Sequence, residues 1–473
     1  MKRFLFSVVA FLMFFSNETA AAEVVSLDRY IGMVKNQNYA LQSAIRSVEA
    51  AYYEVLASVA YQRPSLAGGA SGSYLTGSAS AQSGIREKDI TAYNTTLGLT
   101  HRIDVAGTYT LDERQRILYY ESRRANFDED VNSLVSTAEE NYWSAALARE
   151  NIALQKDVLR QRIENNRVIE EKYKQQIVPR LDLIRSEAQV VEAESLVTNA
   201  EAQYRNLLAT LATLAGGTEV VPIEEPLLLP EFNVTTSLEK TLLLRPAIRA
   251  ARLELDRSRV VKKLREKGLS PTLTAGISWV PLSDPWNSGS VQKGEMTASL
   301  SLNIPIADGN ETKYNILNAD RLIQAAEAGL RSVEIFGARD LSIARNNWDR
   351  AAALEKDKKR QVERSDEELR ITELMYNEGM GAQIDLINAQ TENQRVRTDY
   401  LSAVRDMYVA RVSLRAVAGD YAPDEDGNWK EAVVRYEKGT SILNEMKEKE
   451  LREQQNKSAS LDKSVQKNKS VQK

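Results

Sequence analysis

Two stretches of the chain carry apolar residues that recur three and four positions apart, the spacing of a coiled-coil seam. The first, residues 109–175, contains neither glycine nor proline. Its seam comprises Val131, Val135, Ala138, Tyr142, Ala145, Ile152, Leu159 and Ile163. The second, residues 311–376, carries the seam Ile316, Ala319, Ile323, Ala326, Leu330, Val333, Leu341, Ala344, Trp348 and Ala351. Each predicts a helix on the order of 100 Å long, because an α-helix rises about 1.5 Å per residue.

Three shorter stretches alternate between apolar and polar residues, which predicts β-strands. A fourth predicted strand, residues 64–83, is rich in glycine, serine, alanine and threonine with scattered leucine and tyrosine. In the last of the alternating stretches, Leu300 and Leu302 lie on one face, and Ser299 and Ser301 lie on the other. Large apolar residues on one face against Thr, Ser, Gly and Asn on the other suit a sheet between lipid and water.

The order of elements occurs twice, which indicates an internal duplication. Matching pairs at a constant offset of 203 positions are Tyr173 and Tyr376, Asp182 and Asp385, and Ala215-Gly216 and Ala418-Gly419. The first copy spans residues 23–217 and the second spans 237–420. A linker with three prolines, 218–236, joins them, and a charged, partly disordered tail, 421–473, follows.

Proline and glycine mark the element boundaries within each copy. The first copy is predicted to contain a helix from Ser26 to about Ala60, the strands 64–83 and 91–105, the long helix 109–177 and the return helix 181–216. The second is predicted to contain a helix at 237–267, the strands 271–282 and 295–307, the long helix 311–377 and the return helix 383–419.

Composition excludes several kinds of site. The 473 residues are 43% hydrophobic and 27% charged, with a formal net charge of −4, whereas a nucleic-acid-binding surface carries a basic excess. The chain has no cysteine and one histidine, His101. Zinc sites built on Cys or His, thiol catalysis and disulfides are therefore excluded. We expect no cofactor, no metal site and no nucleic-acid partner, and a structural role for His101.

The N-terminus has the pattern of an export signal. A short basic segment precedes the apolar run 4–15, and the small residues Ala20 and Ala22 offer a cleavage site before Glu23. The apolar run is too short for a transmembrane anchor, which needs about 20 residues. We therefore expect a signal peptide at 1–22 and an exported chain without a transmembrane helix.

The four predicted strands decide the fold class. They leave two unpaired hydrogen-bonding edges, which are a liability in water and prohibitive in lipid. A closed barrel removes both edges, but four strands are too few to close one. Three copies supply twelve strands, an even number of the kind that outer membrane barrels use. The sequence therefore favours a mainly α-helical protein with a trimeric β-barrel portion over a soluble β-sandwich.

Several short motifs accompany the duplicated order. They are Arg245-Pro246 at a helix start with Ala247, Ala250 and Ala251, Ser270-Pro271 at a helix-to-strand step, Pro305-Ile306-Ala307-Asp308-Gly309 at a strand end, and the paired Tyr-x8-Asp-Leu-Ile turns. Together with the duplicated order, they resemble the TolC family of outer membrane efflux and secretion channels over nearly the whole mature length. Asn38-Tyr39 departs from the pattern, in which Asn-Pro is common.

The resemblance implies a homotrimer with a 12-stranded outer membrane β-barrel on a long periplasmic α-helical barrel. Its implied partners are a periplasmic adaptor (membrane fusion) protein, an inner-membrane transporter of the RND or ABC type, and outer membrane lipid. The function that follows is a passive conduit in a tripartite efflux or type I secretion system, which exports small molecules, metals or proteins. The alternative is a periplasmic coiled-coil adaptor or scaffold with a small soluble β domain. We expect no enzyme, because the sequence has no nucleophile elbow, phosphate-binding glycine loop or His/Cys constellation.

The turns between long and return helices are predicted to lie farthest from the strands. Asp182 and Asp385 follow these turns, and carboxylates from three copies would form rings that attract cations. The resemblance implies that Asp182, Asp385 and Tyr376 help to close the periplasmic entrance. Asn388 stands where some family members carry a second acid. The alternative role of each aspartate is to stabilise a helix N-terminus by capping or through the helix dipole.

Two further sets of residues are candidates for contacts outside the chain. The turns offer adaptor-docking points at Val178, Pro179, Arg180, Gly379, Met380 and Gly381, for which simple turn chemistry is an equal explanation. The aromatic residues Tyr74, Tyr93, Trp279 and Trp286 lie near predicted strand ends or loops. Such residues form girdles at membrane interfaces, and ordinary strand packing is the alternative.

Overall fold

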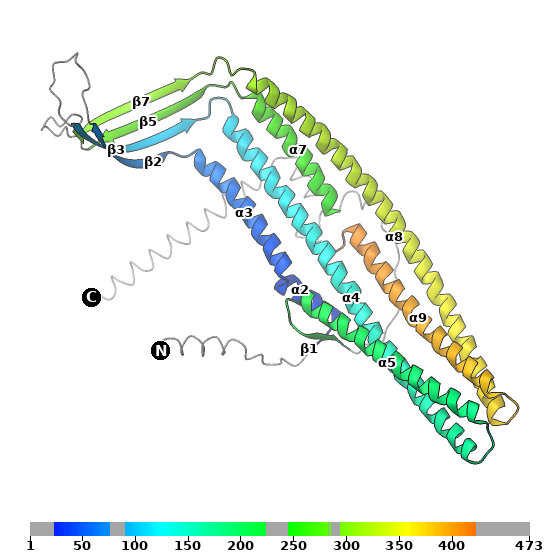
Figure 1. The fold of residues 1–473 in the computed structure, drawn as a ribbon. Helices are drawn as coiled ribbons and strands as arrows, with labels where there is room; N and C mark the ends of the chain where they lie inside the picture. Colours follow the sequence, from blue (N-terminus) through cyan, green and yellow to red (C-terminus); the bar gives the residue numbers. More distant parts are fainter. Residues whose placement is uncertain (1–22, 76–89, 224–244, 282, 285–293, 422–473) are drawn as a thin grey trace, which may run out of the picture. The chain divides into compact units, whose positions relative to one another are not determined.

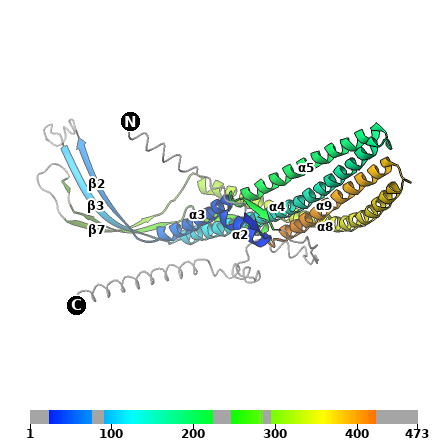
Figure 2. The same ribbon diagram turned by 90° about the horizontal axis from the view of Figure 1, so that it is seen from below.

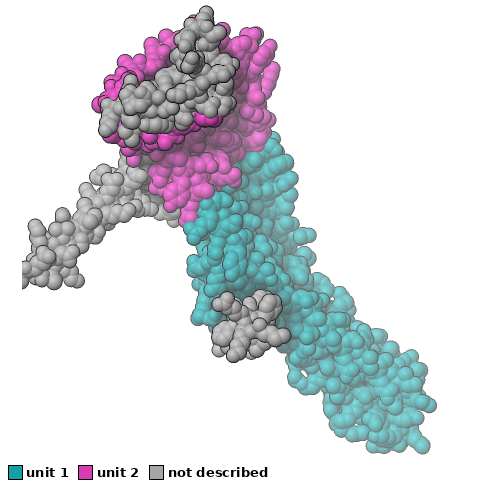
Figure 3. All heavy atoms as spheres, turned by 60° about the vertical axis from the view of Figure 1, so that its left-hand side comes forward, with its two compact units in different colours: residues 1–48, 124–249, 331–423 teal, residues 49–123, 250–330, 424–473 magenta. Residues whose placement is uncertain are grey.

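The computed structural model describes residues 23–75, 90–223, 245–281, 283–284 and 294–421. The expected signal peptide, and the expected tail after Tyr421, lie outside these residues. The chain forms two compact units, which Figure 3 colours separately. The first unit comprises residues 1–48, 124–249 and 331–423, and the second comprises 49–123, 250–330 and 424–473.

Most of the described chain is helical (Figures 1 and 2). The helices are α2 (Leu27–Gln37), α3 (Tyr39–Tyr61), α4 (Thr108–Lys174), α5 (Arg180–Leu214), α7 (Pro246–Glu266), α8 (Glu311–Asn377) and α9 (Gln383–Ala418). The long helices α4 and α8 have 67 residues each, and the return helices α5 and α9 have 35 and 36. These matched lengths reflect the duplication. Among the described helices, none has an apolar stretch long enough to cross a membrane.

The helix expected from Ser26 to Ala60 is interrupted at Asn38, so one continuous helix is the wrong description. Asn38 has an extended backbone, with ψ 120°, between α2 and α3. Its Oδ1 accepts a hydrogen bond from the Ala40 N–H at 2.9 Å and so caps α3. Its Nδ2 donates to the Leu214 carbonyl at the end of α5, at 3.0 Å. The break is therefore stabilised because one side chain satisfies backbone groups of two helices.

The second unit contains an antiparallel sheet with its main strands in the order β2–β3–β5–β7. They are β2 (Ser65–Leu75), β3 (Ile90–Ile103), β5 (Thr272–Val280) and β7 (Glu295–Asn303), and the short β6 (Ser283–Asp284) pairs with β3. The strand expected at 295–307 ends at Asn303, because Pro305 has no N–H to donate to a neighbouring strand. Pro281 likewise follows the end of β5, which is shorter than the expected strand 271–282.

One face of this sheet carries exposed apolar side chains. The register places Leu66, Leu99 and Ile277 side by side across β2, β3 and β5, and places Leu97 beside Trp279. Each of the five is at least 40% exposed. The alternate positions, on the opposite face, are mainly threonine, serine and glycine. Because water rarely faces so continuous an apolar surface, this face requires an apolar partner.

The core of the first unit surrounds Tyr142 of α4. The ring of Tyr30 from α2 stacks on the Tyr142 ring with centroids 5.8 Å apart. The Tyr142 hydroxyl donates a hydrogen bond to the Val25 carbonyl at 2.9 Å. Val25 ends β1 (Glu23–Val25), which pairs in parallel with β4 (Val220–Pro222). β4 therefore gives strand structure to part of the expected linker 218–236, of which residues 224–236 lie outside the described chain.

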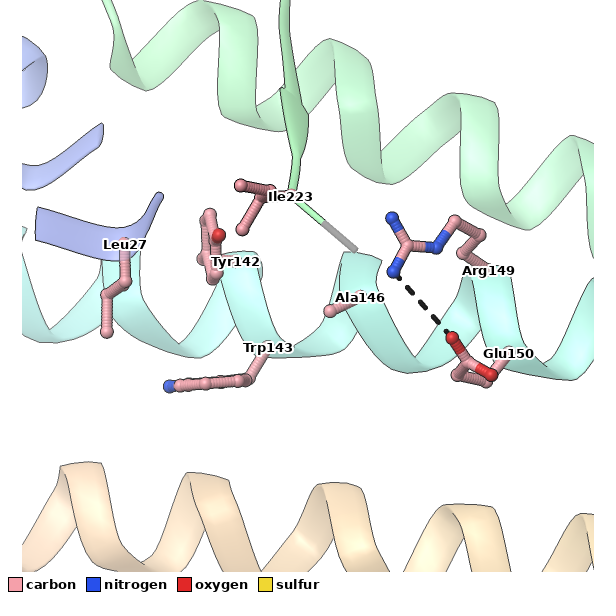
Figure 4. A pocket seen from close by; sticks show the side chains of 7 residues that line it. All are labelled: Leu27, Tyr142, Trp143, Ala146, Arg149, Glu150 and Ile223. Carbon is pink, nitrogen blue, oxygen red and sulfur yellow. Dashed lines mark ion pairs between the residues drawn. The ribbon is translucent and has the colours of Figure 1, made fainter. Parts of the chain in front are cut away.

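A small pocket lies beside this core (Figure 4). It is lined by Leu27, Tyr142, Trp143, Ala146, Arg149, Glu150 and Ile223. Arg149 pairs with Glu150 at 3.7 Å and donates to the Pro222 carbonyl at 3.0 Å, which ties α4 to β4. The volume of about 20 Å³ has room for little more than one water molecule. The pocket is thus a packing gap rather than a ligand site.

A carboxylate of α4 holds the N-terminus of α7 in the first unit. Glu129 accepts a hydrogen bond from the Ala247 N–H, one of the donors that a helix start leaves unpaired. Burial raises the pKa of Glu129, although Arg245 acts in the opposite direction. Arg245 also pairs with Asp340 of α8 at 3.1 Å. The Arg-Pro helix start is therefore anchored to both long helices.

Candidate functional site

The two turns that join the long helices to the return helices have matching backbone geometry. In the first turn Gln176 adopts a left-handed conformation with φ 59°, and in the second Gly379 does so with φ 75°. In each turn, the N–H of the next residue donates to the carbonyl five positions earlier, at 2.9 Å. This is a common way for a helix to end and the chain to reverse. We call residues 175–182 and 378–385 the tip turns.

Asp182 and Asp385 occupy the third position of α5 and α9. The residues at the N-caps are Pro179 and Ala382, and neither helix has a side-chain capping hydrogen bond. Capping therefore explains neither aspartate. The helix dipole favours a carboxylate in the first turn of both helices.

The two aspartates have different surroundings. The side chain of Asp182 is 20% exposed and lies 3.9 Å from Arg185. The Gln383 side-chain amide is oriented so that its nitrogen, rather than its oxygen, faces Asp182. That nitrogen donates to the Asp182 carboxylate and lies 3.2 and 3.3 Å from its two oxygens. Asp385 and Asn388, one turn apart on α9, are exposed. The helices α4 and α5 form one helical hairpin, and α8 and α9 form the other. The duplication makes the two aspartate positions equivalent, but of the two only Asp182 is in hydrogen-bond contact with the other hairpin within the described chain.

Tyr376 joins the two helical hairpins by a different contact. The Nζ atom of Lys172, near the end of α4, lies 4.7 Å from the centroid of the Tyr376 ring. This is a cation–π geometry. Within the described chain, Tyr376 and Asp182 therefore each contact the opposite hairpin, through Lys172 and Gln383, rather than each other.

The residues expected to dock an adaptor lie on the tip turns with mixed exposure. Val178 and Gly381 are half-buried, whereas Pro179, Arg180, Gly379 and Met380 are exposed. Met380 is 71% exposed, so an apolar side chain is available to a partner.

Two of the four expected interface aromatics can be placed on the sheet. Tyr74 near the end of β2 and Trp279 in β5 are 62% and 45% exposed, and their registers put both on the apolar face. The backbone of Tyr93 lies in β3. The Tyr93 side chain and Trp286 lie outside the described residues.

The sequence pattern missed a set of polar residues along α4. The predicted seam is right as far as Ala145, but farther along Ile163 is 50% exposed. The buried positions there are Gln155, Arg162 and Ile169, which are seven residues apart and 5%, 5% and 0% exposed. The prediction followed the apolar residues, whereas the seam continues through polar ones that find partners on other helices. The seven-residue spacing of Gln155, Arg162 and Ile169 was the signal in the sequence that could have identified these buried positions.

One family model and a curated relative match most of the chain. The family model described as "Outer membrane efflux protein" matches residues 30–217 and 237–420. Nodulation protein T from Rhizobium leguminosarum bv. viciae is 21% identical over 420 residues, which cover 86% of this chain and 85% of that protein.

Solved structures share the fold at low sequence identity. A membrane protein from Pseudomonas aeruginosa matches with a TM-score of 0.75 at 19% identity, covering 84% of this chain and 91% of its own. The CmeC outer membrane channel of Campylobacter jejuni matches with a TM-score of 0.72 at 17% identity, covering 86% of this chain and 88% of its own. The expected resemblance is confirmed, and with it the mainly helical, duplicated fold. This chain belongs to the outer membrane efflux protein family.

Proposed function

We propose that three copies of this chain assemble into a passive export channel, with four strands from each copy closing a 12-stranded β-barrel in the outer membrane. The observation that carries this proposal is the sheet of the second unit. Its edge strands β2 and β7 need pairing partners, which neighbouring copies supply. Lipid then covers the exposed apolar face, and the threonine, serine and glycine face lines a water-filled interior.

The helices form the proposed periplasmic part of the channel. The large apolar side chains of α8 that are at least 44% exposed include Leu322, Ile335, Ile343, Leu354 and Ile371. Such residues need cover in a stable assembly, and packing between the helices of neighbouring copies provides it. This observation favours a helical barrel over a monomeric scaffold.

The proposed periplasmic entrance lies at the tip turns. Asp385 is exposed, so three copies around an axis would form a carboxylate ring that attracts cations. Asn388 would line the same entrance without adding charge. Asp182 and Tyr376 have a different role in this proposal, because their contacts with Gln383 and Lys172 hold the two hairpins together.

The proposed partners are a periplasmic adaptor and an inner-membrane transporter of the RND or ABC type. A passive tube has no energy source, so a transporter must drive export. The adaptor would contact the exposed residues of the tip turns, Pro179, Arg180 and Met380 among them. Both efflux and type I secretion fit this arrangement, and the cargo would be chosen by the transporter.

The test begins with location and assembly. The full chain, expressed in a Gram-negative host, is expected in the outer membrane fraction as a trimer that dissociates on heating and forms ion-conducting pores in planar bilayers. A monomer released with the soluble periplasmic fraction, and without pore activity, would contradict the proposal and support the scaffold alternative.

A further inference from the structure

A buried arginine connects three helices of the first unit. Arg162 of α4 is 5% exposed. Its Nη1 donates to Gln189 Oε1 of α5 at 3.1 Å and also to Gln390 Oε1 of α9. Its Nη2 donates to Thr391 Oγ1 of α9 at 3.1 Å. All three acceptors are neutral, so these hydrogen bonds pair a buried charge with uncharged groups.

Gln155, seven residues earlier on α4, extends the same polar layer. It is 5% exposed, accepts a hydrogen bond from Gln394 Nε2 at 2.8 Å and donates to Thr398 Oγ1 at 3.3 Å. Both partners lie on α9. Coiled-coil seams normally place apolar residues at such positions, and polar substitutes reduce stability while fixing the pairing of the helices. We call Gln155 and Arg162, with these partners, the polar clasp.

The same two helices pack differently farther from the tip turns. There the rings of Trp143 and Tyr408 stack with centroids 4.3 Å apart, and Leu147 packs with Val404 and Tyr408. Separating these residues would expose apolar surface to water at a large cost. Separating the polar clasp exchanges hydrogen bonds with protein for hydrogen bonds with water, which costs far less. The α4–α9 contact at Arg162 and Gln155 is therefore easier to separate than the contact at Trp143 and Leu147.

The electrostatics of Arg162 also fit a releasable contact. Burial lowers the pKa of its guanidinium, and Glu192 acts in the opposite direction. A buried charge paired with neutral groups adds little net stability, because desolvation offsets the hydrogen bonds. Arg162 thus gives the hairpins a defined arrangement without holding them there strongly.

We propose that the polar clasp is a further intramolecular restraint on the entrance, so that α9 moves away from the α4–α5 hairpin when the hydrogen bonds of Arg162 and Gln155 are released. The inference rests on the proposed channel function. Arg162 and Gln155 are then positioning residues that act on the entrance from outside the tip turns.

The experiment compares three variants as trimers in planar bilayers. Arg162→Ala removes all three donated hydrogen bonds and is expected to raise the frequency of large-conductance openings several-fold, up to about tenfold, because the net contribution of such hydrogen bonds is modest. Arg162→Lys keeps the positive charge but lacks the planar guanidinium with its several donors. Its opening frequency should lie between those of Arg162→Ala and the native chain. Arg160→Ala is the matched control, because the Arg160 side chain is 78% exposed and its ion-pair partner within the described chain is Asp157 of the same helix, at 2.9 Å. The control should gate like the native chain.

Two further measurements keep the inference testable if Arg162→Ala fails to fold. Gln390→Ala removes an acceptor and leaves Arg162 in place, and it should also raise the opening frequency. Because the chain has no cysteine, Gln155→Cys with Gln394→Cys permits a short bismaleimide to cross-link α4 to α9. Cross-linking should then suppress the openings.

The outcomes separate this inference from the function on which it rests. A native trimer that never conducts would overturn the channel itself. A native trimer that conducts, with folded Arg162→Ala or Gln390→Ala trimers that open like Arg160→Ala, would overturn the clasp alone. Unchanged openings after complete cross-linking would overturn it as well.

Discussion

The Tyr421 hydroxyl donates a hydrogen bond to Glu139 Oε2 across 2.6 Å, which connects the segment after α9 to the middle of α4. Glu139 is 1% exposed, and Arg415 lies 3.4 Å from the same oxygen. The Tyr421 N–H donates to Asn132 of α4 at 3.3 Å. Burial raises the pKa of the Tyr421 phenol, and Glu139 raises it further, so the hydroxyl stays protonated and remains a donor.

Replacing Tyr421 with phenylalanine should destabilise the protein by about 1–3 kcal/mol, because a buried carboxylate loses a hydrogen-bond donor while the ring still packs. Thermal unfolding followed by circular dichroism measures the effect. Tyr39→Phe is the matched control, since Tyr39 is 73% exposed and should change little. Equal unfolding midpoints for the two variants would show that the hydroxyl contributes nothing.

Gly216 lies close to the backbone of Gln37, and its neighbour Gly217 provides a comparison without such a contact. Gly216 has φ +71°, and an added Cβ would lie 2.6 Å from the Gln37 carbonyl oxygen. Gly217 has φ +95°, but nothing lies within 4 Å of its added Cβ. Gly217→Ala should cost about 1–2 kcal/mol through backbone strain alone, whereas Gly216→Ala should cost about 2–4 kcal/mol because a clash adds to the strain. The comparison uses unfolding midpoints, and equal losses would contradict the contact.

Glu129 should make stability depend on pH. Because burial raises its pKa, the folded chain binds more protons than the unfolded chain between the ordinary and the raised pKa. The contribution of Glu129 to stability therefore falls as the pH rises through that window and returns on acidification. Glu129→Gln keeps an acceptor for the Ala247 N–H but cannot titrate.

From about pH 4 to about pH 7, the unfolding midpoint of Glu129→Gln should rise relative to that of the native chain. Glu194→Gln, at an exposed position, serves as the control. Parallel pH curves for native chain and Glu129→Gln would contradict the prediction.

Asp385 should control ion selectivity if the tip turns form the entrance. Asp385→Asn is expected to lower the cation-to-anion permeability ratio about two- to tenfold, because a ring of carboxylates is lost. Asn388→Asp adds a carboxylate one turn away and should shift the ratio in the opposite direction. Asp182→Asn should have a smaller effect, because Gln383 already engages that carboxylate.

Reversal potentials across a salt gradient in planar bilayers provide the measurement. An unchanged reversal potential for both Asp385→Asn and Asn388→Asp would remove these residues from the conduction path.

Sequence periodicity predicted much of the fold because the long helices repeat one local pattern. It failed where partners lie far away in the sequence. Arg162 and Gln155 are buried because Gln390 and Gln394 satisfy them from α9, and no local pattern reveals that pairing. Asn38 ends α2 for the same reason, since its partner is a carbonyl of α5.

The candidate site was harder to predict than the fold. The duplication makes Asp182 and Asp385 equivalent, and on sequence alone they share one role. They differ in the structure because Gln383 reaches the carboxylate of Asp182, whereas the position equivalent to Gln383 in the first copy is Arg180. A repeat thus predicts where residues lie along the helices better than it predicts their neighbours.

The parallel pairing of β1 with β4 has a consequence for the order of folding. Glu23 and Val220 lie roughly 200 residues apart, and contacts over such separations form slowly. The cluster around this pairing draws its buried residues from the first copy and the start of the linker, from Val25 to Val220, and none from the second copy. The first copy can therefore form its own core once residue 222 is available. The second copy then folds against a half that is already folded.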